Sequence, residues 1–343
     1  MDALDGLLNG PRAQGAFLLR AVMDPPWSVR VQDEAPLSLV AMARGEAWVV
    51  PDRGQPAHLG PGDVAVLRGP DPYVFADEPG TPPQAIIHPG QRCTDPAGND
   101  LGHALYQGVR TWGTATAGGT RLLVGTYERV GELGRRLLGA LPGLVVVPAA
   151  AVRSPLVGLL GDEIARDEPG QDVVLDRMLD LLVVAVLRAW FSDADGNPPG
   201  WYRASADPVV GPALRLLHDQ PAHPWTVAGL AAEVGVSRAA LARRFTELVG
   251  QPPMAYLTEW RLDLAAELLL EPGTTIGAVA QRVGYGSAFA LSAAFRRVRG
   301  VSPREHRQAA AGQEPERPGR SPQPKSPRFG GDHQLRSEGS RQH

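Results

Sequence analysis

The sequence predicts a multidomain α+β protein with a β-rich N-terminal half, a helical linker and an all-α C-terminal domain. Short apolar runs separated by Gly, Pro and Asp fill the chain to about residue 130, and a helical period replaces them from about residue 132. Two similar helix–turn–helix patterns follow near the C-terminus. We therefore expect units at 1–145, 146–205 and 206–307, and a disordered tail at 308–343 that is rich in Pro, Gly, Ser and Arg.

Length and composition set the broad class of protein. The 343 residues suffice for two or three domains with sizeable cores. No apolar run approaches the roughly 20 residues of a membrane-spanning helix, and the N-terminus lacks the basic region of a signal peptide. Cys93 is the only cysteine, which excludes an intrachain disulfide and a zinc site built from several cysteines. We expect a cytoplasmic protein with no membrane partner.

The net charge of −3 conceals an asymmetry between the two ends of the chain. Residues 226–307 carry ten Arg against seven Asp and Glu, which gives +3, and residues 308–343 carry six basic against four acidic residues, which gives +2. Subtracting both from −3 leaves −8 for residues 1–225. The basic excess lies where a polyanion would bind, although +3 alone is weak support for such a partner.

The N-terminal half is typical of a small antiparallel barrel or sandwich. Its apolar runs include "SLVAMA", "EAWVV", "DVAVLR" and "RLLVGTY", with turn residues between them. In "HLGPGDVAVLRG" a Pro-Gly-Asp turn leads directly into an apolar strand. A helix that ends at Pro142 follows, and then a longer helix from Asp172 to Phe191.

The second half of this longer helix is apolar nearly all round, and Asp172 is its expected N-cap. A helix of this kind is buried on several sides, which leaves two interpretations open. It is a core helix, or one face packs on the β-domain while another packs on a second subunit. In the second case the dimerisation residues are Val183, Val184, Val186 and Leu187.

An internal repeat occupies the C-terminal domain. The stretches "WTVAGLAAEVGVSRAALARRFTELVG" and "TTIGAVAQRVGYGSAFALSAAFRRVRG" align at an offset of 49 before the turn and 50 after it. Each copy, at about 226–249 and 275–299, predicts a helix, a turn and a second helix. The matched pairs include Thr226 and Thr275, Ala231 and Ala280, Gly235 and Gly284, Ser237 and Ser287, Leu241 and Leu291, Phe245 and Phe295, and Gly250 and Gly300.

The matched residues fit specific structural roles. The Thr and Ser pairs are expected helix N-caps, and Gly235 and Gly284 lie where the turn needs a positive φ. Apolar residues that bury the two second helices are Leu241, Phe245 and Leu248 in the first copy, and Leu291, Phe295 and Val298 in the second. Between the copies, "PMAYLTEWRLDLAAELLLEPG" predicts one helix stopped by Pro272-Gly273, about 25 Å long at 1.5 Å per residue.

The paired motifs, the linking helix and the closing "GVSPREHR" resemble the DNA-binding domain of AraC/XylS-family transcription regulators over about 206–307. The stretches "LSLVAMARGEAWVV" and "HLGPGDVAVLRGPDPYVFAD" more loosely resemble the cupin-type sensor domain of that family. The resemblance implies binding of double-stranded promoter DNA, contact with RNA polymerase, an unknown small-molecule effector and a homodimer. The resemblance fits a transcriptional activator, and a repressor is the alternative that stays open.

The outward faces of the two second helices are the expected DNA contacts. Arg243 is the best candidate for base recognition, because Arg can bond O6 and N7 of guanine together. Its repeat partner is Ala293, where many members of the family carry a polar or basic residue. The alanines in the second helix of the second copy leave two interpretations open. They allow the helix to approach the DNA groove closely, or they are simply good helix formers. The predicted contacts are Arg238, Ala239, Ala242, Arg243, Ser287, Phe289, Ser292, Arg296, Arg297 and Arg299, of which the last three are expected at phosphates.

The N-terminal half lacks a metal-ligand pattern. Ser38 and Tyr73 lie near where the ligands of a catalytic cupin would be expected, and His58, His88 and His103 are scattered. We therefore expect no catalytic residue, metal or cofactor, and treat a cupin enzyme with a fused nucleic-acid-binding domain as the alternative function. Cys93 is either a passive buried thiol or a redox-reactive one whose pKa is lowered by His88 and Arg92.

Overall fold

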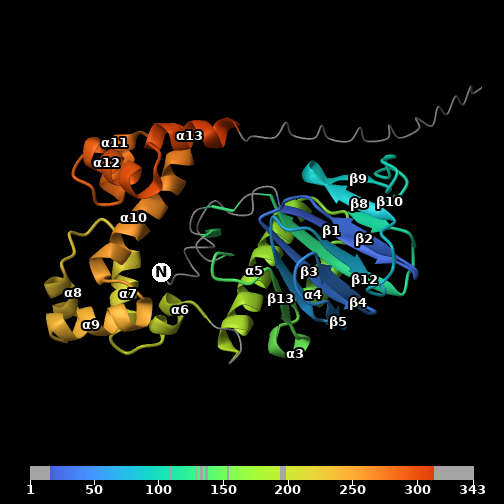
Figure 1. Ribbon diagram of the computed structural model, residues 1–343, viewed down its shortest axis with the longest axis horizontal. Helices are drawn as coiled ribbons and strands as arrows, with labels where there is room; N and C mark the ends of the chain where they lie inside the picture. Colours follow the sequence, from blue (N-terminus) through green and yellow to red (C-terminus); the bar gives the residue numbers. More distant parts are fainter. Residues whose placement is uncertain are drawn as a thin grey trace, which may run out of the picture.

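The structure is a computed structural model that describes residues 16–108, 110–128, 130–131, 134–135, 138–152, 154–193 and 198–312. Two regions are evident in Figure 1, a β-rich domain and a helical domain that contains both repeats. The β-rich domain confirms the predicted α+β class and its strands at "SLVAMA", "EAWVV", "DVAVLR" and "RLLVGTY". None of the described helices is long and apolar enough to cross a membrane.

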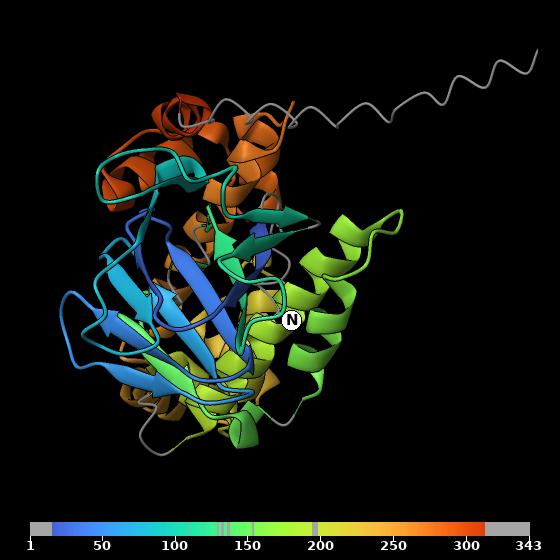
Figure 2. The same ribbon diagram turned by 90° about the vertical axis from the view of Figure 1, so that its right-hand side faces the viewer.

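Two sheets form the β-rich domain, and most of their neighbouring strands are antiparallel (Figures 1 and 2). The seven-stranded sheet has the order β10-β11-β1-β12-β3-β6-β13, and the six-stranded sheet has the order β5-β4-β7-β2-β8-β9. The strands are β1 (Ala16–Met23), β2 (Ser28–Val31), β3 (Leu37–Arg44), β4 (Ala47–Pro51), β5 (Ala57–Leu59), β6 (Val64–Arg68), β7 (Tyr73–Ala76), β8 (Ala85–His88), β9 (Arg92–Thr94), β10 (Tyr106–Gly108), β11 (Thr111–Gly113), β12 (Thr120–Tyr127) and β13 (Leu144–Val147).

The seven-stranded sheet is apolar on both faces, because successive side chains of a strand point to opposite sides. In β3, Val40 and Met42 enter the core between the two sheets, whereas Leu39 and Ala41 enter the core beneath the helices. The helices over that second face are α3 (Ala149–Val152), α4 (Leu156–Glu163) and α5 (Gln171–Ser192). The domain therefore has three layers, with the seven-stranded sheet in the middle.

Helix α5 is the long helix that the sequence predicts, and its packing favours the core interpretation. Val184, Val186 and Leu187 are 6%, 0% and 2% exposed, and Val183 is partly buried against the same core. Val186 and Leu187 belong to the core beneath the seven-stranded sheet, whereas Val184 is buried on a different face of the helix, so none of the three presents an exposed surface in this chain. The expected cap at Asp172 was also wrong, since α5 starts at Gln171 after Gly170 and no side chain caps it.

The helical domain contains two small cores joined by one helix. The first core lies among α6 (Gly200–Ser205), α7 (Val210–Asp219), α8 (Val227–Glu233), α9 (Arg238–Val249) and the start of α10 (Pro253–Leu270). The second core lies among the end of α10, α11 (Ile276–Arg282) and α12 (Ala288–Arg299). Helix α13 (Pro303–Gly312) closes the domain. Figure 1 shows α9 and α12 near opposite ends of α10.

Three expected unit boundaries differ from the packing. The boundary at 145 falls inside β13, which pairs with β6 through Val147. The boundary at 205 separates α6 from the helical domain, yet Ala204 is fully buried in the first helical core. Helix α13 runs to Gly312, past the boundary at 307. The rest of the expected tail, 313–343, and part of the helix expected before Pro142 lie outside the described residues.

Candidate nucleic-acid interface

The predicted caps and turns of both repeats are confirmed. The side chains of Thr226 and Thr275 accept hydrogen bonds from backbone N–H groups at the start of α8 and α11, at 3.0 and 3.1 Å. Ser237 and Ser287 do the same for α9 and α12, at 3.2 and 3.1 Å. Gly235 and Gly284 have φ values of 71° and 82°, a region that favours glycine. Each repeat is therefore a helix–turn–helix unit with the same local construction.

The apolar residues of the repeats hold each second helix against its own core. Leu241 and Phe245 of α9, and Leu291 and Phe295 of α12, are fully buried, as predicted. Val298 was expected in the same set but is 49% exposed. The burial fixes which face of α9 and α12 points outward, because residues on one helical face recur every three or four positions.

The outward face of α9 carries two arginines. Arg238, Ala239 and Arg243 are exposed, and Ala242 is partly buried. Arg243 contacts Glu247 one turn away with a nitrogen–oxygen distance of 3.8 Å, and both side chains are largely exposed. An exposed pair of this kind contributes little, so the Arg243 guanidinium is available for another partner.

The outward face of α12 is apolar at its start and basic at its end. Phe289 is 83% exposed, the largest value among the exposed large hydrophobic residues of the described chain. Ser287 caps the helix, and the hydroxyl of Ser292 donates to the Ala288 carbonyl at 2.8 Å. Arg296 and Arg297 are exposed in the last turn. The two helices thus offer different chemistry to a common ligand.

Arg299 is placed differently from Arg296 and Arg297. Its Nη2 lies 2.6 Å from an Asp263 oxygen on α10, and both side chains are mostly buried. Its guanidinium also lies over the Phe295 ring, 5.5 Å from the centroid. Arg299 therefore ties α12 to α10, and its predicted phosphate contact would require loss of this pair.

A second ion pair, which the sequence analysis did not identify, holds α9. Arg244 makes a two-nitrogen contact with Asp207, with Nη2–Oδ2 at 2.7 Å and Nε–Oδ2 at 2.9 Å. Hydrogen bonds from Arg244 lower the pKa of Asp207 from 3.8 to about 2. Arg244 and Asp207 are 37 residues apart, so no local pattern reveals the pair.

The closing motif has a structural role. Ser302 and Glu305 form a capping box, in which each side chain accepts a hydrogen bond from the other residue's backbone N–H. Arg307 then donates to the Leu269 and Thr274 carbonyls at 2.8 and 2.7 Å. These contacts satisfy carbonyls at the end of α10 and just beyond it. Helix α13 therefore anchors the second unit.

The scattered histidines of the N-terminal domain do not gather into a metal site in the described part of the chain. Among the described residues there is no group of three or more His, Cys, Asp and Glu side chains that could hold a metal ion. Tyr73 is buried, and its hydroxyl has a side-chain hydrogen bond with Ser38. Burial raises the pKa of the Cys93 thiol to about 11, which is opposite to the lowering expected from His88 and Arg92.

Comparisons with protein families agree with this division of the chain. A family described as "Cupin" matches residues 2–192, and a family described as "Helix-turn-helix domain" matches residues 230–309. The cupin match includes α4 and α5 as well as the strands. The helices over the seven-stranded sheet therefore fall within the cupin-family match.

The chain is also similar to regulators along most of its length. It is 32% identical over 313 residues to an AraC-like transcription regulator from Streptomyces lividans, covering 90% of this chain and 98% of the relative. It is 36% identical over 183 residues to the regulator AlkR of Acinetobacter baylyi, covering 52% and 60%. An AraC-type transcriptional regulator structure from Chromobacterium violaceum is 30% identical, with a TM-score of 0.30, and covers 33% of this chain and 99% of that one. This chain therefore belongs to the AraC-like transcription regulators, with a cupin N-terminal domain and a helix-turn-helix DNA-binding domain.

Proposed function

We propose that the protein binds specific sequences in double-stranded promoter DNA and regulates transcription there, and that an effector held by the cupin domain controls it. The observation that carries this proposal is the pair of helix–turn–helix units with outward-facing second helices. A single unit would place one helix in a major groove. Two units on one chain support contact with two successive stretches of the same duplex.

The linking helix supports this geometry. Helix α10 has 18 residues, which at 1.5 Å each span about 27 Å. Successive major-groove sites on one face of DNA lie roughly 34 Å apart. A rigid link of this length is compatible with α9 and α12 entering neighbouring turns, when the width of the two units is added.

For the cupin domain we favour a regulatory role over a catalytic one. Its relatives are transcription regulators, and the lining of its interior is mostly apolar. RNA polymerase is the proposed downstream partner and the cytoplasm the proposed location. Stoichiometric transition metal in protein purified without added chelator would favour the cupin-enzyme alternative.

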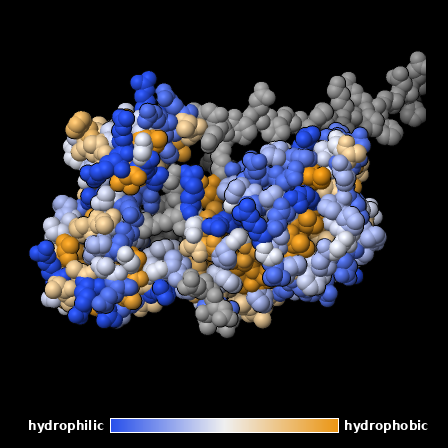
Figure 3. Space-filling view, viewed as in Figure 1, coloured by the Kyte–Doolittle hydropathy of each residue, from blue (hydrophilic) through white to orange (hydrophobic). Residues whose placement is uncertain are grey.

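The proposed homodimer would use a different surface from the one expected. Val173, Val174 and Leu181 of α5, and Leu159 of α4, are 62%, 44%, 54% and 51% exposed. Figure 3 shows scattered hydrophobic residues among hydrophilic ones on one face of the β-rich domain. Leu181→Asp should lower the sedimentation coefficient of a dimer without unfolding it, whereas Val184→Asp should unfold the domain. A wild-type chain that stays monomeric at tens of micromolar would exclude the dimer.

The DNA-binding proposal is tested with the full chain. It is titrated with genomic promoter fragments in the presence of competitor duplex at a stated salt concentration. We expect at least one fragment to bind far more tightly than the competitor, and equal affinity for all duplexes would overturn the proposal. A fragment covering 198–312 should retain this selectivity, whereas one covering 206–307 should be less stable because it lacks the buried Ala204 of α6.

A further inference from the structure

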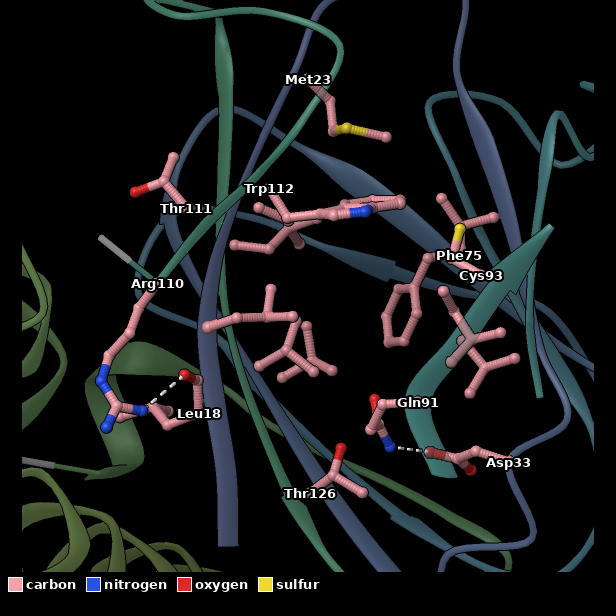
Figure 4. A pocket seen from close by; sticks show the side chains of 18 of the residues that line it. Leu18, Met23, Asp33, Phe75, Gln91, Cys93, Arg110, Thr111, Trp112 and Thr126 are labelled. Carbon is pink, nitrogen blue, oxygen red and sulfur yellow. Dashed lines mark hydrogen bonds between the residues drawn. The ribbon is translucent and has the colours of Figure 1, made fainter. Parts of the chain in front are cut away.

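A cavity of about 380 Å³ lies between the two sheets of the cupin domain. Figure 4 shows it between Met23 and Trp112 at one end and Thr126 at the other. Phe75 and Cys93 border it on the side of the six-stranded sheet. Small-molecule sites have volumes of about 300–1,000 Å³, and a dry cavity of about 150 Å³ holds a benzene molecule. This cavity therefore has room for a molecule of about two rings.

The lining is mainly apolar. Trp27, Val29 and Val31 line it from or near β2, and Leu122 and Val124 line it from β12. The Cys93 thiol is protonated at neutral pH, because burial raises its pKa to about 11. A ligand that covers these side chains gains stability from the removal of apolar surface from water, and polar groups on the ligand would lose hydration without compensation.

Both charged side chains of the lining already have partners. Asp33 accepts a hydrogen bond from the Gln91 amide at 3.2 Å and another from the Ala35 N–H at 3.1 Å. Arg110 donates to the Leu18 carbonyl at 3.3 Å and is ion-paired with Asp172. A charged ligand would have to break one of these arrangements or remain unpaired in an apolar space, which is costly.

One fully buried polar atom among the lining residues has no hydrogen-bond partner in the described part of the chain. The indole N–H of Trp27 is buried without a hydrogen-bond acceptor, and the Trp27 side chain is fully buried. A buried donor left unsatisfied costs about 1–3 kcal/mol. The N–H group has almost no accessible surface, so a hydrogen bond from it to a ligand would require Trp27 to move.

From these observations we propose that the cavity binds an uncharged, mainly apolar molecule of about two-ring size. The inference deepens the proposed function, because it names the class of effector and its site. It disfavours sugars, which would leave many hydroxyls unsatisfied, and organic anions, which would have to displace Asp172 from Arg110.

The rim of the cavity also indicates how occupancy reaches the DNA-binding domain. Arg110, which borders the cavity between β10 and β11, is ion-paired with Asp172 in the first turn of α5. At the other end of α5, the Phe191 ring packs on Tyr202 of α6 with centroids 4.7 Å apart. Helix α5 thus connects the cavity rim with the first helical core, and a ligand that moves Arg110 acts on this connection.

The ligand class is tested by calorimetry on the full chain with two probes of one shape, naphthalene-2-methanol and naphthalene-2-carboxylate, and with a pentose. We expect saturable binding of the alcohol and at least tenfold weaker binding of the carboxylate and the pentose. Equal binding of the two naphthalene probes, tighter binding of the pentose, or no binding of the alcohol up to its solubility limit would overturn the inference.

The location is tested by filling the cavity. Val31→Phe on β2 should abolish binding of the alcohol, whereas Val74→Phe should not, because Val74 on the paired strand β7 does not line the cavity. Val124→Phe, on the opposite sheet, replaces Val31→Phe if that variant does not fold. Unchanged alcohol binding in a folded cavity variant would contradict the site.

The connection and the DNA-binding proposal are separated by parallel measurements. Asp172→Asn should leave alcohol binding intact and reduce the change in promoter affinity that the alcohol causes, whereas the exposed Asp167→Asn should change neither. Alcohol binding without selective DNA binding would refute the proposed function and leave the ligand site standing. Selective DNA binding without alcohol binding would refute the ligand site alone.

Discussion

The two helix–turn–helix units have the same caps, the same turn glycines and the same buried aromatic residue, but their outward faces differ. Helix α9 presents Arg238 and Arg243, whereas α12 presents Phe289 and a run of alanines before its basic last turn. The inner faces are constrained because each must fill a core and cap a helix. The outer faces are not needed for either role, so they can differ without loss of the shared fold.

The two units also differ in the ion pairs that hold their second helices. Arg244 ties α9 to Asp207 ahead of α7, and Arg299 ties α12 to Asp263 of α10. The two arginines are not repeat partners, since Arg244 aligns with Ala294 and Arg299 with Val249 at an offset of 50. The units therefore share a fold but are attached to their surroundings by different contacts.

The largest effects should come from removing the shared buried aromatic residue. Phe245→Ala and Phe295→Ala each delete a fully buried ring, which costs about 3–5 kcal/mol. Because the two rings lie in separate cores, each loss should be confined to its own unit. Hydrogen exchange measured by mass spectrometry should show lost protection in α8 and α9 for the first variant, and in α11 and α12 for the second. Equal loss in both units would mean that they unfold as one.

The next prediction separates base recognition by Arg243 from phosphate contact by Arg297. Arg243→Ala should cost about 1–3 kcal/mol on the preferred site and relax selectivity at one base pair. Arg297→Ala should weaken binding to all duplexes alike and reduce the salt dependence of affinity. Both variants are compared by titration at two salt concentrations. The assignments would be exchanged if Arg297→Ala altered base preference and Arg243→Ala did not.

A smaller effect is expected at low pH, where the stability of the α9 unit should fall more than that of the α12 unit. The pKa of Asp207 is held at about 2, below its ordinary value, because Arg244 donates to the carboxylate. The depressed pKa means that the stabilisation is fully present above about pH 4 and is lost as the pH falls towards 2. Since Arg244 is half exposed, solvent screening makes the contribution smaller than the pKa shift alone would give.

This prediction is checked by urea unfolding between pH 5 and pH 2.5. The wild-type chain should lose more stability over this range than Asp207→Asn, and the loss should appear in the α9 unit first. Glu271→Gln, which removes an exposed pair with Arg282, serves as the matched control and should follow the wild type. Identical pH profiles for wild type and Asp207→Asn would show that the pair does not stabilise the folded state.

Much of the DNA-binding domain could be predicted from sequence because its signals are local. A cap, a turn glycine and a buried residue recur at fixed spacing, and their repetition in two copies removes ambiguity. The pairs Arg244–Asp207 and Arg299–Asp263 join residues 37 and 36 positions apart, so no window contains them. The cavity is likewise built by strands distant in sequence, and its lining residues read as ordinary core residues.

Helix α5 shows the limit of periodicity. Its apolar second half indicated burial on several sides, but it could not indicate which partner buried each side. In the structure the core beneath the sheet includes Val186 but not Val184, which is buried on the side of the helix that also carries the exposed Val173. The pattern therefore predicted that the second half of α5 is buried, and it gave no signal for the exposed apolar residues Val173, Val174 and Leu181.

The smallest predicted effect tests whether α12 reads DNA through apolar contact. Phe289 is 83% exposed at the start of a helix whose neighbouring positions are alanines, so an aromatic ring is the main group there that can touch a base. Apolar side chains recognise thymine through its C5-methyl group, and burial of one such carbon contributes about 0.8 kcal/mol. Replacing single thymines by uracil in the part of the site bound by α12 should therefore weaken wild-type binding by about 1 kcal/mol at one position. Phe289→Ala should be insensitive to the same replacement, whereas Arg243→Ala should keep the sensitivity because it lies in the other unit. If wild type and Phe289→Ala respond alike to every uracil, Phe289 does not contact a thymine methyl and the second unit binds through its arginines alone.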